Sequence, residues 1–70
     1  MTQSQAAVLK ALAETWSLAP DLRFGQLMAN LGFITEDQTD SSLWDIEDDS
    51  LLAVIENHRS NLSRRQSQVA

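Results

Sequence analysis

The sequence predicts a small all-α domain of three helices, with an acidic loop between the second and the third. Apolar residues recur at the three- and four-residue spacing of a helix face in three separate stretches. A proline and a polar, acidic segment separate these stretches. A length of seventy residues is enough for one domain at most, and the absence of cysteine excludes a disulfide that would support it. We therefore expect a single helical domain over residues 1–62 and a flexible polar tail over residues 63–70.

The first helix is predicted over residues 4–17. Thr2 and Gln5 have the spacing of a capping box, in which each side chain bonds to the backbone of the other residue. Several alanines favour the helix and leave one side narrow, which lets a second helix approach closely. The apolar stripe consists of Leu9, Leu12, Ala13 and Trp16, with Val8 beside it.

The second helix is predicted over residues 20–31. Pro20 suits the first helical position, and Asp21 complements the positive end of the helix dipole. Gly32 follows the last apolar position and is typical of a helix terminator. The stripe of this helix consists of Phe24, Leu27, Met28 and Leu31.

Residues 33–47 are predicted to be irregular, and the third helix is predicted over residues 48–62. Seven of the fourteen residues from Glu36 to Asp49 are acidic. Glu47 or Asp48 is expected to cap the third helix, and Trp44 and Ile46 to hold the loop against the helices. The stripe of the third helix consists of Leu51, Val54, Ile55, His58 and Leu62.

The three stripes predict one shared core. A chain of this length builds a small core, and small domains often gain stability by oligomerising. Val8, Leu22 and Leu52 lie beside the stripes, so we expect a homodimer that buries some of them. The predicted core residues are Leu9, Leu12, Trp16, Phe24, Leu27, Met28, Leu31, Leu51, Val54 and Ile55.

Ten acidic and five basic residues give a formal net charge of −5. A negative field repels phosphate backbones, so nucleic-acid binding is disfavoured. The apolar runs are far shorter than the ~20 residues that span a bilayer, and residues 1–5 lack the features of a secretory signal. We therefore expect a cytoplasmic protein that does not contact membranes.

The acidic loop partly matches a helix–loop–helix calcium site. Counting from Asp37, Ser42 stands where the loop requires glycine, and Asp48 where it requires a bidentate glutamate. The only histidine, His58, has no nearby motif that would supply a nucleophile or an orienting carboxylate. We therefore expect no catalytic residue, no metal, no cofactor and no enzymatic activity.

Two blocks of the chain carry a resemblance, namely Pro20-Asp21-Leu22-Arg23-Phe24-Gly25-Gln26-Leu27 and Trp44-Asp45-Ile46-Glu47-Asp48-Asp49-Ser50-Leu51-Leu52. They are similar to blocks found in a family of small uncharacterised bacterial proteins. The resemblance covers roughly residues 12–56. It implies a bacterial source and a helical organisation, and it carries over no established activity.

We expect a protein-interaction module, a small regulatory or accessory protein of an unidentified pathway. Two alternatives stay open. One is a transcription-linked regulator that contacts DNA as a dimer through its tail or its second helix, with Arg59, Arg64 and Arg65 presented together. The other is an acidic decoy that occupies a basic site on a partner. The residues expected to contact a partner are Arg23, Glu36, Asp37, Asp40, Trp44 and Asp45.

Overall fold

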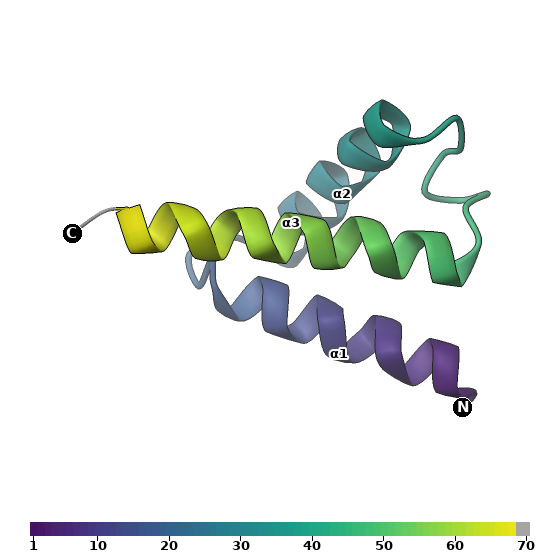
Figure 1. Ribbon diagram of the computed structural model, residues 1–70, viewed down its shortest axis with the longest axis horizontal. Helices are drawn as coiled ribbons and strands as arrows, with labels where there is room; N and C mark the ends of the chain where they lie inside the picture. The colour runs from purple at the N-terminus through teal and green to yellow at the C-terminus, as the bar shows by residue number, and fades with distance from the viewer. Residues whose placement is uncertain (69–70) are drawn as a thin grey trace.

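The computed structural model describes residues 1–68, with side chains through residue 65, and confirms the all-α prediction. Three helices make up this part of the chain: α1 (Gln3–Ser17), α2 (Phe24–Gln38) and α3 (Asp48–Gln68). α1 and α3 lie side by side and run in the same direction, and α2 packs on α3 and returns the chain (Figure 1). Over residues 1–68, no helix combines the length and apolarity needed to cross a membrane.

The start of α1 is as predicted, but the helix buries a different face. Thr2 Oγ1 accepts the Gln5 N–H at 3.1 Å, and Gln5 Oε1 accepts the Thr2 N–H at 2.8 Å, which completes the capping box. Ala11 and Thr15 are buried against the rest of the molecule, whereas Leu9 and Trp16 lie outside the core. The narrow face packs inward because small side chains let α1 approach α3 closely.

α2 begins four residues later and ends seven residues later than predicted. The Leu22 N–H donates to the Ala19 carbonyl at 3.0 Å, so the residues after Pro20 form a turn. Gln26 Oε1 then accepts the backbone N–H of Arg23, whose extended backbone starts the helix. Gly32 does not end α2. Gly32 lies inside the helix. The helix continues through Thr35, which is buried about one turn further on.

The connection between α2 and α3 is shorter than the predicted irregular segment. Residues 39–47 form it, and Asp40, Asp45 and Glu47 are its only carboxylates. The Ser42 carbonyl accepts the Asp45 and Ile46 N–H groups, so this stretch is a turn. The acidic loop of the prediction is thus an acidic segment, residues 36–49, shared between two helix ends and this connection.

α3 begins at the predicted residue, with a different cap. The backbone carbonyl of Glu47 accepts the Leu51 N–H at 2.9 Å. Over residues 1–65, neither the Glu47 nor the Asp48 carboxylate accepts a backbone N–H, contrary to the prediction. α3 also runs past Leu62, its predicted end, to Gln68, so residues 63–68 of the predicted tail are helical. Residues 69–70 of the predicted tail lie outside the described residues.

The core lies where α1 and α2 meet α3. Its buried apolar residues are Ala11, Leu27, Leu31, Val54 and Ile55. Partly buried apolar side chains pack around them, namely Val8, Leu12, Leu22, Met28, Leu43, Leu51 and Leu52. Three predicted core residues, Leu9, Trp16 and Phe24, are instead exposed. Val8, Leu22 and Leu52 pack within the domain, so their burial does not require a second copy of the chain. α1 and α2 contact α3 far more than they contact each other.

Candidate functional site

The acidic segment gathers seven carboxylates at one end of the fold. Glu36 and Asp37 lie in the last turn of α2, and Asp48 and Asp49 in the first turn of α3, with the connection between them (Figure 1). Residues 24–58 contain eight acidic residues and no lysine or arginine. Within residues 1–65, both ion pairs are made by Arg59, and neither uses a carboxylate of the acidic segment. The segment is therefore an uncompensated negative surface.

Trp44 projects from this surface into solvent. Its side chain is 93% exposed, so it does not anchor the connection against the helices as predicted. The following residue, Asp45, accepts a hydrogen bond from Ser42 Oγ at 3.0 Å, which fixes the turn that carries the tryptophan. Phe33 is 72% exposed and lies one helical turn before Glu36 and Asp37. Aromatic rings beside carboxylates can stack on a guanidinium or ammonium group while the carboxylates pair with it.

Five of the six predicted contact residues belong to the acidic segment, and the sixth lies at the other end of α2. Glu36, Asp37, Asp40, Trp44 and Asp45 lie within one stretch of ten residues. Arg23 directly precedes the first residue of α2, whereas Glu36 is near its last. The helical rise of 1.5 Å per residue puts about 20 Å between these two positions along the axis. Arg23 is therefore not part of the acidic surface.

Sequence reasoning missed an aromatic pair that closes the turn between α1 and α2. The ring centroids of Trp16 and Phe24 are 5.2 Å apart, with the ring planes tilted by 49°. Trp16 Nε1 donates a hydrogen bond of 2.7 Å to the Leu22 carbonyl. Tryptophan commonly combines an apolar contact with one such polar bond. Both rings therefore hold the turn although each is more than a third exposed.

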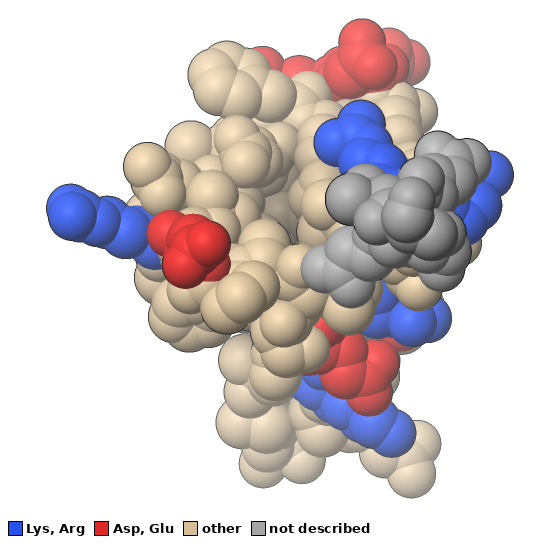
Figure 2. Space-filling model, turned by 90° about the vertical axis from the view of Figure 1, so that its left-hand side faces the viewer, with Lys and Arg blue, Asp and Glu red and all other residues tan. Residues whose placement is uncertain are grey.

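The arginines of α3 have different surroundings. Arg59 donates to Glu56 at 2.8 Å and lies 3.8 Å from Glu14, so it links α3 to α1. The hydrogen bond to Glu56 raises the pKa of Arg59 above its ordinary value. Arg64 donates to Asn61 Oδ1. Figure 2, which views the end of the fold where α3 terminates, shows basic side chains on several sides of this end.

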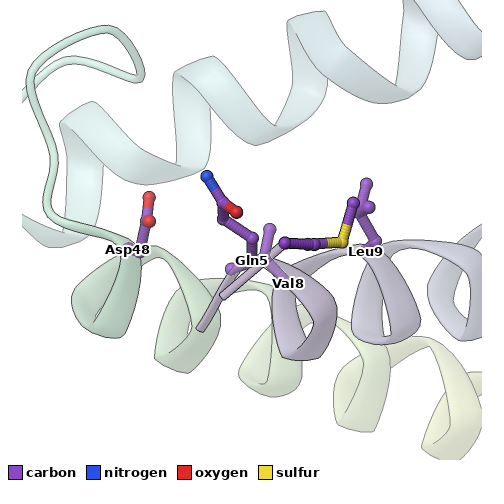
Figure 3. A pocket seen from close by; sticks show the side chains of 5 residues that line it. Gln5, Val8, Leu9 and Asp48 are labelled. Atoms are coloured by element: carbon purple, nitrogen blue, oxygen red, sulfur yellow. The ribbon is translucent and has the colours of Figure 1, made fainter. Parts of the chain in front are cut away.

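A pocket of about 500 Å³ opens between the first half of α1 and the start of α3. Gln5 and Leu9 project from α1, and Asp48 lies at the start of α3 (Figure 3). Met1 and Val8 complete the lining, which is mostly apolar.

A smaller pocket of about 190 Å³ lies between α2 and the C-terminal half of α3. Its lining residues are Ile34, Gln38, His58, Asn61, Leu62 and Arg65. Burial, and then the charge of Arg65, lower the pKa of His58 below its ordinary value. The sequence analysis missed this pocket because it placed Ile34 and Gln38 in a loop rather than on α2.

Among the described residues, no three His, Asp or Glu side chains are arranged to hold a metal ion. In comparisons with known proteins, no protein family, no curated protein and no solved structure matches the chain. The resemblance to uncharacterised bacterial proteins therefore stays a prediction.

Proposed function

We propose that this protein is a non-enzymatic interaction module, a small regulatory or accessory protein that binds a basic surface of another protein. The contact surface is the acidic segment, and Trp44 is its anchor. The observation that carries the proposal is the 93% exposure of Trp44 within a segment whose carboxylates have no cationic partner in residues 1–65.

Burial energetics support an anchor role for Trp44. A tryptophan buries roughly 150–250 Å² when it enters an apolar site, and each Å² contributes about 25 cal/mol. Full burial against a partner would therefore supply about 4–6 kcal/mol before the costs of association. Tryptophan is enriched among the few residues that dominate binding energy. No other large side chain of the acidic segment offers a comparable gain.

The carboxylates supply partner choice and encounter rate. A rim of one charge sign steers an oppositely charged partner and rejects partners of like charge. Glu36, Asp37 and Asp40 precede Trp44 in the chain, and Asp45 and Glu47 follow it. We expect the partner to present lysine or arginine around an apolar recess.

A decoy is a second candidate, favoured by the lack of any lysine or arginine in residues 24–58. A surface with that charge can occupy a partner site that otherwise holds a polyanion such as nucleic acid. Competition between this protein and an oligonucleotide for the captured partner distinguishes a decoy from a simple adaptor.

We also propose a homodimer and a cytoplasmic location. Since Val8, Leu22 and Leu52 pack within the domain, the side chains that a second copy would cover are Leu9 and Phe24, which are 50% and 46% exposed. Sedimentation equilibrium of the wild type and of Leu9→Ser tests the dimer. Fractionation of the source cells tests the location.

The test of the main proposal is affinity capture from the source cells with three forms of the full chain. The wild type should retain a specific partner, and Trp44→Ala should lose it. Asp21→Asn, a surface substitution outside the acidic segment, is the control variant and should behave as the wild type. Capture of the same proteins by the wild type and Trp44→Ala would contradict the proposal.

A further inference from the structure

We propose that the pocket between α2 and the C-terminal half of α3 binds a small organic carboxylate. Its carboxylate group would contact Arg65, and its short apolar tail would lie against Ile34 and Leu62. Of its lining residues only Gln38 lies in the acidic segment, so the proposal does not rest on the interaction surface.

The α3 side of the pocket favours an anion, although the whole chain is acidic and Glu36 and Asp37 lie beside Gln38 on α2. Residues 57–70 contain three arginines, one histidine and no carboxylate side chain. Arg59 is engaged by Glu56 and Glu14, and Arg64 by Asn61. Within residues 1–65, the guanidinium of Arg65 makes neither a hydrogen bond nor an ion pair. Among residues 1–65, Arg65 is therefore the arginine of this group without a hydrogen-bond or ion-pair partner.

The pocket combines this cation with neutral donors and an apolar wall. His58, Asn61 and Arg65 recur at the i, i+3, i+7 spacing that lines up side chains along α3. α2 contributes Ile34 and Gln38, which are four residues apart and share a face. A neutral imidazole keeps one N–H donor, and the amides of Gln38 and Asn61 carry donors as well. A ligand site typically combines a small number of converging polar groups with a partly apolar pocket.

Size and helix polarity narrow the ligand class. The volume of about 190 Å³ is below the roughly 300–1,000 Å³ typical of drug-sized ligands, so the ligand is small. The negative end of the α3 dipole opposes an anion with about half a charge, and the full charge of Arg65 outweighs it. A planar carboxylate matches the fork of a guanidinium, and a fully hydrated phosphate would make no use of Ile34 and Leu62.

The single histidine makes the test direct. Titrations of the labelled full chain with butyrate, butanol and inorganic phosphate are followed by NMR through the ring signals of His58. Arg65→Gln removes the proposed contact, and Arg23→Gln makes the same change at the far end of α2. We expect butyrate to shift the His58 signals saturably, with affinity reduced at least tenfold in Arg65→Gln and unchanged in Arg23→Gln. Butanol should give no saturable shift, and phosphate should bind more weakly than butyrate.

A pH titration of His58 gives a second readout. Arg65 is the charged residue among those lining the pocket, and the two lining residues from α2 do not titrate. Bound butyrate should therefore raise the pKa of His58, as should Arg65→Gln without ligand. An unchanged pKa in a folded Arg65→Gln variant would place Arg65 outside the pocket and overturn the proposal. So would the absence of a saturable butyrate shift, equal binding of butyrate by Arg65→Gln, or equal affinity for butanol or phosphate.

Discussion

Replacing Thr35 by valine should stabilise the fold. Thr35 is fully buried, and its hydroxyl has no hydrogen-bond partner within the described residues. A buried hydroxyl without a partner costs about 1–3 kcal/mol in proteins, and valine replaces it by a methyl group of similar size. Both residues are β-branched and have similar helix propensities, so α2 itself should be little affected. We expect Thr35→Val to raise the free energy of unfolding by about 1–2 kcal/mol.

The matched control is Thr15→Val in α1. Thr15 is equally buried, but its Oγ1 donates a 2.7 Å hydrogen bond to the Ala11 carbonyl. Removing a satisfied hydroxyl loses about 0.5–1.5 kcal/mol while adding a buried methyl group, so the net change should be small. Urea and thermal unfolding followed by circular dichroism measure both variants, and 1 kcal/mol corresponds to about 4–8 °C for a domain of this size. An equal gain in both variants, or no gain in Thr35→Val, would refute the reasoning.

Three further predictions concern the core, the caps and pH. Leu27→Ala, at a fully buried position, should lower the free energy of unfolding by about 2–5 kcal/mol, whereas Leu9→Ala at a half-exposed position should lower it by about 1 kcal/mol or less; urea unfolding measures both, and equal losses would contradict the burial of Leu27. Thr2→Ala should lower the free energy of unfolding by about 0.5–2 kcal/mol because it removes the α1 cap, and Asp48→Ala should lower it by less. Melting temperatures measure both variants, and a larger loss in Asp48→Ala would show that Asp48 caps α3. The lowered pKa of His58 means that the unfolded chain takes up the proton first, so stability should fall as pH falls through about 6.5 and level off below the folded-state pKa. Thermal unfolding of the wild type and His58→Gln between these limits should show this step in the wild type alone.

The helix count and part of the core could be predicted from periodicity. Leu27, Leu31 and Ile55 were expected inside and are buried, because each lies on a clear stripe. The buried face of α1 was predicted in part. The alanines indicated a side that a second helix could approach closely, and Ala11 is buried there, whereas the large apolar residues Leu9 and Trp16 were placed in the core and are exposed.

Local signals were overridden at the ends of α2. Pro20 and Gly32 are typical boundary residues, and a prediction from them placed the helix too early. Burial of Thr35 against α3 depends on the partner helix, which local sequence does not report.

The candidate sites were predictable to different degrees. The acidic residues are visible in the sequence, since their density does not depend on the fold. The exposure of Trp44 was not, because hydrophobicity alone assigns a large aromatic residue to the core. The pocket near His58 required the true length of α2, since Gln38 joins it only when the helix continues past Gly32.

The central position of α3 has a consequence for how the chain folds. α1 finds its main packing partner only after residues 18–47 have brought α3 alongside it. Closing so long a loop costs conformational entropy before α1 gains its contacts, and contacts distant in sequence slow folding relative to local ones. α2 and α3 are neighbours in the chain, so we expect them to pack together first and α1 to dock last. Substitutions at the interface of α1 and α3 should then increase the unfolding rate more than they decrease the folding rate.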